Sequence, residues 1–147
     1  MTAGCLAGWI AAATVVAGTV SAADPDPNLE AVQTVCGRCH TIAVFLDKPL
    51  AWDRWNDVFA DMTQRGASGT DEQLERVTTY FLEHLTFVNV NTSPAEEIAG
   101  VLGVGDAVAG AIIASRQRQP FANLAELRAV PGVDPAKLEL RKSRILF

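Results

Sequence analysis

Five consecutive residues near the start of the chain have the types and spacing that bind a porphyrin covalently. Cys36-Gly37-Arg38-Cys39-His40 places two thiols one helical turn apart and an imidazole directly after the second thiol. The two thiols can form thioethers with the two vinyl groups of haem, and the histidine can then ligate one face of the iron. The pattern therefore predicts one covalent haem c, attached at Cys36 and Cys39 and ligated by His40.

Other uses of two cysteines and a histidine fit this chain less well. A structural zinc site needs four ligands, usually in two close pairs, but the only other histidine is His84 and the third cysteine, Cys5, has no nearby partner in the sequence. A thioredoxin-like redox pair is expected within a βαβ pattern, and none is visible. A disulfide or a reduced thiol pair remains the alternative to haem attachment.

The opposite face of the iron needs a second ligand, for which two residues compete. Beyond Ala23, Met62 is the only methionine, and a thioether sulfur is a standard partner for histidine at a c-type haem. Trp52, Trp55, Phe59 and Met62 recur every three or four residues, so the alternative for Met62 is a packing role on an apolar helix face. We expect Met62 to be the ligand, with His84 as its rival.

The segment from Met1 to Ala23 resembles an export signal. It carries no charged side chain, is rich in Ala, Val, Gly and Thr, and ends in small residues, although the usual positive charges at the start are missing. We expect cleavage after Ala22 or Ala23, no membrane span after cleavage, and a mature chain in the periplasm or outside the cell. An uncleaved membrane anchor is the alternative. Export agrees with the haem motif, because bacteria form these thioether bonds outside the cytoplasm.

Residues 24–87 predict three helices and show no strand pattern. Asp26 and Pro27 indicate a helix that starts at Pro27 and runs to the haem motif. A second helix is expected from about Ala51, and a capping box that begins at Thr70 opens a third. The apolar face of the third helix is expected to consist of Leu74, Val77, Phe81, Leu82 and Leu85. Three helices around a haem resemble a small class I-like cytochrome c.

Residues 88–147 contain a helix-turn-helix pattern twice, at a period of about 30 residues. Ser93 is expected to cap a helix that starts at Pro94. Glycine-containing turns follow at 102–106 and 131–134, and the last helix is expected from Pro135 to about Arg144. No Gly/Ser-rich spacer separates this half from the first, so we expect the two halves to abut. The expected fold class is all-α, with two domains.

The second half resembles a tandem helix-hairpin-helix domain, above all that of the bacterial competence DNA receptor, ComEA. The resemblance rests on the Val-Asn-Val-Asn-Thr segment at 88–92, Leu-Gly-Val-Gly at 102–105 and Pro-Gly-Val at 131–133. In that family the hairpins bind the sugar-phosphate backbone without reading sequence, since glycines allow close approach and helix N-termini face the anion. The resemblance implies phosphate contacts at Gly103, Val104, Gly105, Gly132 and Val133, helped by Lys137, Arg141 and Lys142.

Two acidic residues depart from this pattern. Asp134 stands where the family usually has another glycine, and Asp106 directly follows the first hairpin. A carboxylate at a helix N-terminus competes with phosphate. Lys137, Arg141, Lys142 and Arg144 form an expected basic patch, extended by Arg116 and Arg118. A structural or protein-docking role is the alternative to DNA contact.

The charge of the chain is unevenly divided between the two halves. The whole chain has a net charge of −5. Residues 24–87 hold 11 acidic and 5 basic side chains, a net charge of −6, whereas residues 88–147 hold 6 acidic and 7 basic, a net charge of +1. The two halves therefore offer different surfaces to partners.

These observations predict an exported c-type cytochrome for electron transfer, with a helix-hairpin-helix module that docks it to a redox partner or to DNA. No acid-base pair, nucleophile or substrate-pocket motif is visible, so we do not expect an enzyme. Two alternatives stay open. One is a non-specific DNA-binding protein, for uptake or DNA-bound electron transfer, that carries a redox haem. The other is a haem-based sensor with an open iron site.

Overall fold

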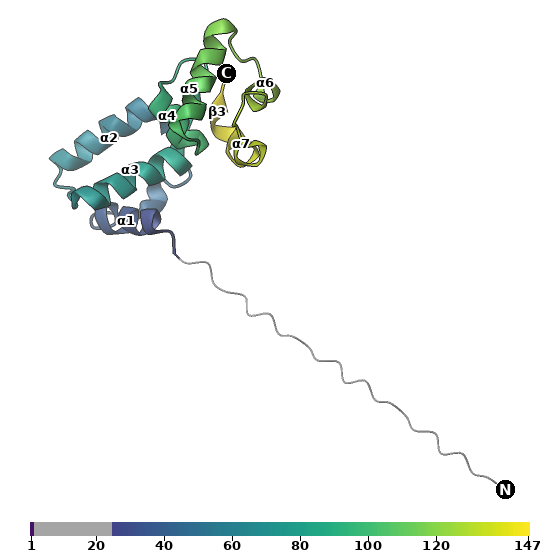
Figure 1. Cartoon of the computed structure of the whole chain (residues 1–147). Coiled ribbons are helices and arrows are strands. Elements are labelled where there is room, and N and C mark those ends of the chain that lie inside the picture. The colour runs from purple at the N-terminus through teal and green to yellow at the C-terminus, as the bar shows by residue number, and fades with distance from the viewer. Residues whose placement is uncertain (2–24) are drawn as a thin grey trace.

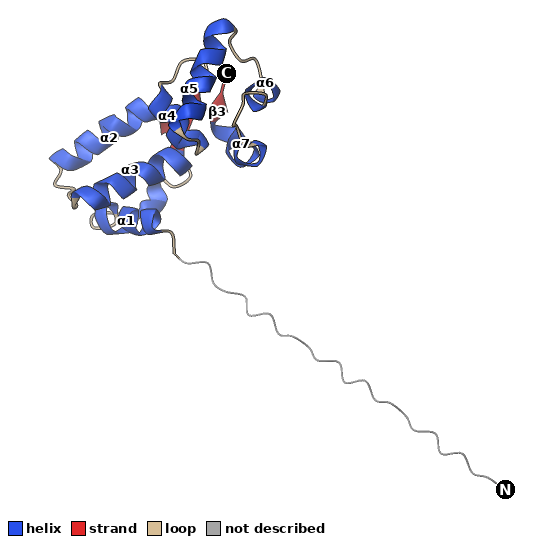
Figure 2. Cartoon of the chain, in the orientation of Figure 1, coloured by secondary structure: helices blue, strands red, loops and turns tan. Residues whose placement is uncertain are grey.

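A computed structural model describes Met1 and residues 25–147, so the export signal expected at 1–23 lies outside the described part apart from Met1. The described chain is mainly helical (Figures 1 and 2). The helices are α1 (Pro27–Cys36), α2 (Trp52–Gln64), α3 (Asp71–Leu85), α4 (Ala95–Leu102), α5 (Asp106–Arg118), α6 (Leu124–Arg128) and α7 (Pro135–Arg141). Short 3-10 turns lie at Ile42–Val44 and Lys142–Arg144, and the strands are β1 (Leu50–Ala51), β2 (Thr86–Asn89) and β3 (Ile145–Leu146).

The first three helices confirm the predicted starts and stops. Asp26 caps α1 by accepting from the N–H of Asn28, and the capping box at Thr70 opens α3. The chain leaves α2 through Gly66, whose positive φ of 98° suits a residue without a Cβ. The last helix is shorter than predicted, because α7 ends at Arg141 and a 3-10 turn carries the chain on to β3.

The first core forms where α1 packs along α3, as Figure 1 shows. Its buried residues are Ala31, Val32 and Val35 from α1, Trp55 from α2, and Val77, Phe81 and Leu85 from α3. Two members of the predicted apolar face behave differently. Leu74 is 44% exposed because it lies in the first turn of α3, where the packed core ends. Leu82 packs against the second core instead of the first.

The second core lies among α4, α5, α6, α7, β2 and β3. Thirteen buried residues from these elements and their loops build it, among them Ile98, Leu102, Ile112, Leu127 and Leu138. The predicted cap of α4 is wrong by one residue: Pro94 is the N-cap. Ser93 instead uses its hydroxyl to accept from the N–H of Asn89, which tightens the turn before α4.

Three short parallel strands, which the sequence did not predict, join the two halves. β1 pairs with β2 and β2 with β3, so β2 lies between a strand from each half. β1 and β3 have two residues each, too short to produce a readable alternation. The halves therefore abut as expected, and they share a small sheet.

The C-terminal end of α3 receives hydrogen bonds from the side chains of its surroundings. The indole N–H of Trp55 donates to the carbonyl of Leu85 at 2.7 Å, and the hydroxyl of Thr86 donates to the carbonyl of Phe81 at 2.8 Å. A helix leaves its last carbonyls without partners in the helix, and α3 has no glycine cap to satisfy them. The buried Trp55 side chain supplies one of the missing donors, and the Thr86 hydroxyl adds a donor to the carbonyl just before the last four.

Arg144 supplies further donors to the same helix end from the other half of the chain. Its guanidinium donates to the carbonyls of Leu82 (3.2 Å), Thr86 (3.0 Å) and Glu83. Burial lowers the pKa of Arg144, and the neighbouring Arg141 lowers it further. The predicted assignment of Arg144 to a free basic patch is therefore wrong, because this residue anchors the second half to α3.

Replacing Arg144 tests this anchor. Arg144→Gln should lower the free energy of unfolding by about 2 kcal/mol, because a charged donor is lost and half-buried carbonyls lose their partner. Urea unfolding followed by circular dichroism measures the change. Lys142→Gln is the matched control at an exposed cation close by in the sequence and should stay within about 0.5 kcal/mol of the parent. Equal stability of the two variants would contradict the anchor.

Candidate functional sites

The haem-attachment motif lies at the end of α1, where the chain turns away from the first core. Cys36 is the last residue of α1 and is half-buried against that core, while Cys39 and His40 are exposed. Nδ1 of His40 lies 3.2 Å from the carbonyl oxygen of Thr41. A carbonyl only accepts, so in the neutral imidazole this contact places the hydrogen on Nδ1 and leaves the lone pair on Nε2, the arrangement that metal-binding histidines use.

The first core, on which Cys36 packs, is covered by side chains that are themselves only partly buried. Eight hydrophobic residues pack on it while only partly buried: Cys36, Ile42, Phe45, Leu46, Leu50, Trp52, Phe59 and Tyr80. Phe45 lies edge-on to the ring of His40, with centroids 6.2 Å apart, and it also contacts Phe81. Thiols, an imidazole with a free Nε2 and half-exposed aromatic rings in one place are a donor set and a surface that suit a flat, apolar macrocycle.

The two candidates for the second axial ligand lie towards opposite ends of α1. Met62 is half-buried near the end of α2, and the turn that follows brings Gly69 against Val35, the residue before Cys36. His84 is exposed and stacks on Tyr80, with ring centroids 4.6 Å apart. The charge on Asp26, at the start of α1, contributes after burial to the raised pKa of Tyr80. His84 therefore lies towards the start of α1, at the opposite end from the haem motif.

The two cysteines differ in exposure. Burial raises the pKa of the Cys36 thiol, so the thiolate is less available there. Among residues 25–147, no group of three or more His, Cys, Asp or Glu side chains converges as a site for a metal ion. A haem iron does not need three protein ligands, because the porphyrin supplies four of its ligands.

The first glycine hairpin connects α4 to α5. Gly103 ends α4 in the left-handed region at φ 63°, which an L-residue adopts only with strain. The N–H of Val104 donates to the carbonyl of Ala99, so this predicted phosphate contact has its amide engaged already. Gly105 then begins α5 in extended conformation.

The start of α5 leaves backbone donors exposed. Within the described chain, no side chain caps α5, and the N–H groups of Gly105, Asp106 and Ala107 have no hydrogen-bond partner. All three residues are exposed or partly exposed, and a Cβ at Gly105 would meet no atom within 4 Å. The amides of Asp106 and Ala107 were not among the predicted contacts, because sequence spacing marks glycines and not the helix turn that follows them.

The second hairpin has the same backbone turn but a helix start that a side chain caps. Gly132 has a φ of 85° and ends the turn that α7 follows. The carboxylate of Asp134 accepts from the N–H of Ala136 at 2.8 Å and so caps α7. Pro135 is the first residue of the helix and has no N–H to offer. The predicted contacts at Gly132 and Val133 therefore lie beside a helix start that is partly capped, at which the N–H groups of Asp134 and Lys137 still have no hydrogen-bond partner among the described residues.

Two cations of α7 lie over the first hairpin. The ammonium of Lys137 donates to the carbonyl of Gly103 at 2.7 Å. A methyl group at Gly103 would lie 2.9 Å from Nη2 of Arg141, so this guanidinium also covers the hairpin. Lys142 instead pairs with Glu139, whose pKa the Lys142 ammonium lowers.

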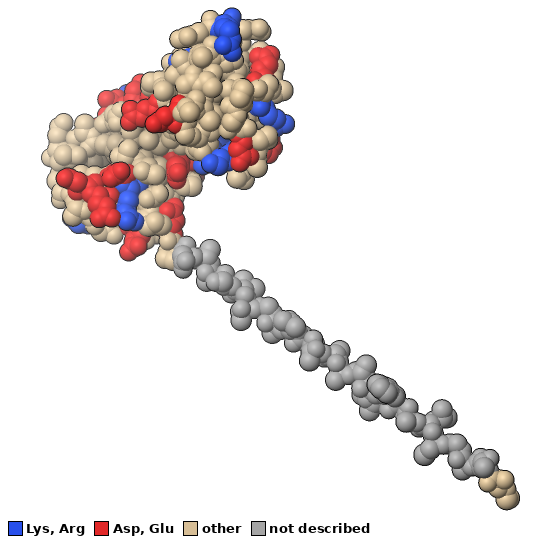
Figure 3. Space-filling model, in the orientation of Figure 1, with Lys and Arg blue, Asp and Glu red and all other residues tan. Residues whose placement is uncertain are grey.

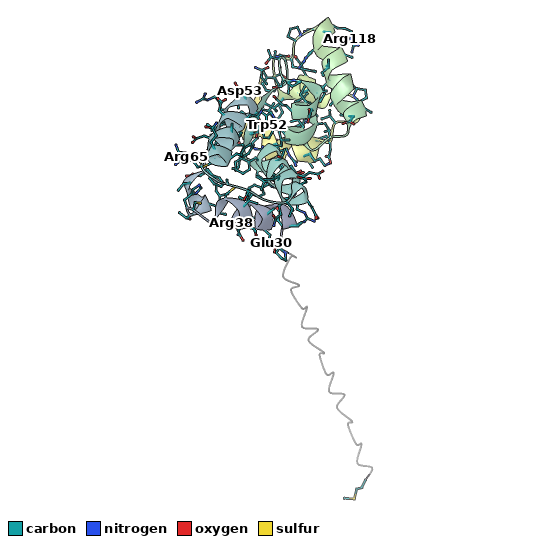
Figure 4. All side chains as sticks on the ribbon, turned by 90° about the vertical axis from the view of Figure 1, so that its left-hand side faces the viewer. Glu30, Arg38, Trp52, Asp53, Arg65 and Arg118 are labelled. Atoms are coloured by element: carbon teal, nitrogen blue, oxygen red, sulfur yellow. The ribbon has the colours of Figure 1, made fainter. Side chains whose placement is uncertain are left out.

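The other arginines of the predicted patch lie elsewhere. Arg116 donates to the carbonyls of Val90 (2.9 Å) and Ser93 (2.7 Å), which fixes the segment between β2 and α4. Its predicted place in a free basic patch is therefore wrong. Arg118 is exposed at the far end of α5, at the opposite end of the molecule from Arg38 in the haem motif (Figure 4). The cations that remain at the first hairpin are Lys137 and Arg141.

The surface charge follows the division seen in the sequence. Figure 3 shows acidic side chains gathered over the half that carries α1, and basic and acidic side chains interspersed over the other half. On α2, Asp53, Asp57 and Asp61 are exposed at intervals of four residues, and Arg54 and Arg65 pair with the last two. No single described helix is long and apolar enough to cross a membrane, although α4 and α5 pass that test as a bent pair.

Comparison with known proteins identifies the second half. Residues 84–145 match a family model described as a helix-hairpin-helix motif. Searches against curated proteins and against solved structures gave no match. The matched segment runs from the last turn of α3 to β3 and contains both glycine hairpins, while the haem motif lies outside it. The second half of the chain is thus a helix-hairpin-helix domain.

Proposed function

We propose that this chain is an exported nucleic-acid-binding protein that carries one covalent haem c. Its helix-hairpin-helix domain binds the phosphodiester backbone without reading sequence. The observation that carries the proposal is the open start of α5, where the N–H groups of Gly105, Asp106 and Ala107 are unpaired and Lys137 lies beside the same hairpin. A family match to the helix-hairpin-helix motif supports the same use.

Phosphate binding at this place needs only backbone and charge. The three N–H groups donate to phosphate oxygens, and the partial positive charge at the N-terminus of the 13-residue α5 favours the anion. Gly105 lets the nucleic-acid backbone come close, and Lys137 adds a positive charge next to the hairpin. None of these groups reaches for a base edge, so binding is expected to be independent of sequence.

The first domain supplies the residues that would hold the haem. Cys36 and Cys39 would form its thioethers, His40 would ligate the iron through Nε2, and Phe45 would pack against the ring. Met62 is the favoured second ligand, since the turn after α2 lies at the haem-motif end of α1 and His84 does not. When bound, the group supplies one-electron transfer. The half-exposed aromatic side chains exclude water from its face.

A second function is an electron carrier whose helix-hairpin-helix domain docks on a protein partner. The acidic surface of the first domain and the carboxylate of Asp106 beside the open hairpin favour it, because both repel a polyanion. The two functions differ in one measurable property: only the first requires the open start of α5 to bind phosphate.

Titration with a labelled DNA duplex tests the DNA proposal. Two phosphate contacts predict a log-log salt slope of about −1.8, so affinity should fall about twelvefold between ~50 and ~200 mM salt. The dissociation constant should be no tighter than ~10⁻⁶ M at physiological salt. Lys137→Gln should weaken binding to every sequence alike and reduce the slope by about 1.

Arg118→Gln is the matched control, since this exposed arginine lies at the far end of α5 and should leave binding unchanged. A protein that shows no binding at low salt would leave protein docking as the role of the domain. Binding that persists at high salt would contradict the phosphate mechanism.

Haem content and ligation are tested by spectroscopy of the exported protein. A pyridine haemochrome should report one c-type haem per chain, and extraction of the haem by acidic butanone would show that it is not covalently held. Met62→Ala should abolish the sulfur-to-iron absorption band and allow carbon monoxide to bind, whereas His84→Ala should change neither. The opposite result for the two variants would assign the ligand to His84, and carbon monoxide binding by the parent would favour the sensor.

A further inference from the structure

The helix-hairpin-helix domain repeats one unit twice: the first unit is the hairpin at Gly103 with α5, and the second is the hairpin at Gly132 with α7. Each hairpin is contacted by a side chain from the other unit. Gly103 and Gly132 occupy equivalent places in the two hairpins, and both have positive φ. Arg141 of the second unit covers Gly103, and Val108 of the first unit covers Gly132, with Cγ2 only 2.8 Å from where a methyl group would stand. The domain is therefore built on a reciprocal exchange of contacts.

The side chains that the two units exchange differ in charge. When the two units are aligned on these glycines, Lys137 corresponds to Val108, and Arg141 corresponds to the buried Ile112. The first hairpin thus receives two cations, while the residues at the equivalent positions of the first unit are apolar. Within the described residues, Nε of Arg141 is buried and has no hydrogen-bond partner. The Nη2 end of the same guanidinium lies against Gly103, so its positive charge is held at the first hairpin.

The helix starts show the same inequality. The N–H groups of Gly105, Asp106 and Ala107 are open at α5, as described above. At α7, Pro135 has no N–H and Asp134 occupies the N–H of Ala136. Each helix start carries one carboxylate, Asp106 at α5 and Asp134 at α7, but only Asp134 caps its helix. The first hairpin therefore offers an anion three open N–H groups and two cations, whereas at the second only the N–H groups of Asp134 and Lys137 stay unpaired among the described residues.

We propose that the domain contacts only one strand of a nucleic acid, through the first hairpin alone. It therefore binds single-stranded nucleic acid with an affinity similar to that for duplex. This inference rests on the phosphate binding proposed above and specifies its partner. Two hairpins that both bind phosphate would each contact one strand, and they would require a duplex of fixed width. A single phosphate-binding hairpin contacts about two neighbouring phosphates of one strand, and the second strand makes no contact with it.

A comparison of strands tests this inference with the mature full-length protein. Fluorescence anisotropy would compare a labelled 30-nucleotide single strand with the duplex of the same sequence at several salt concentrations. Two phosphates on one strand predict slopes of about −1.4 for the single strand and about −1.8 for the duplex. The affinities should agree within about threefold once the doubled number of sites on the duplex is counted.

Two variants with the same change of charge report which hairpin faces the phosphate. Asp106→Asn removes a negative charge beside the open start of α5 and should tighten binding to both ligands by about two- to fivefold. Asp134→Asn removes the equivalent charge at α7 but keeps a good N-cap, so the fold is preserved and the gain should be clearly smaller. Circular dichroism of both variants checks that the helices are intact.

The outcomes separate this inference from the proposed function. Binding to duplex alone, with a slope of about −3.6 that four phosphates would give, would overturn the one-strand grip and leave DNA binding in place. A gain from Asp134→Asn equal to that from Asp106→Asn would also overturn it, since both hairpins would then face phosphate. The absence of binding to either ligand at low salt would overturn the proposed function and the inference with it.

Discussion

The carbonyl groups at the C-terminal end of α3 need donors, and the chain brings those donors from both of its halves. Trp55 donates from α2 in the first half, and Arg144 donates from the turn before β3 in the second. An unsatisfied buried carbonyl costs about 1–3 kcal/mol, so these contacts strongly favour one arrangement of the two halves. The shared sheet follows from it, because β2 leaves the end of α3 with β1 on one side and β3 on the other.

This arrangement also decides which cations remain available to a partner. Arg144 and Arg116 donate to backbone carbonyls away from the hairpins, and Lys142 pairs with Glu139. Lys137 and Arg141 are the cations at the first hairpin, where Lys137 donates to the carbonyl of Gly103. A domain with a net charge of +1 and two well-placed cations suits weak, salt-sensitive contact with phosphates. Its attachment to an acidic half limits that contact further, since like charges repel the nucleic acid.

The sequence predicted the helices better than it predicted the contacts between them, because helix caps and turns are local signals. Asp26 and Thr70 cap helices as expected, because each accepts a hydrogen bond from an amide two or three residues away. The helix-hairpin-helix domain was predicted from its glycine turns, and the family match confirms it. The haem motif and its ligands remain predictions, which rest on residue types and on the place of the motif at the end of α1.

Contacts between distant residues were the part that the sequence could not predict. The role of Arg144 depends on the end of α3, which lies far away in the sequence, and no periodicity reports such a contact. The short strands β1 and β3 exist only because β2 lies between them. The difference between the hairpins was visible in Asp134, but the exchange of Lys137 and Val108 between units required the fold.

Backbone amide chemical shifts during titration with a short oligonucleotide test the central claim most directly, because they report each hairpin separately. The account predicts that the ¹H–¹⁵N signals of Gly105, Asp106 and Ala107 shift most and that those of Gly132 and Asp134 stay close to their free positions. The shifts should vanish as salt is raised, since phosphate contacts carry the binding. Equal shifts at both hairpins, or shifts confined to the surface of the first half, would contradict it.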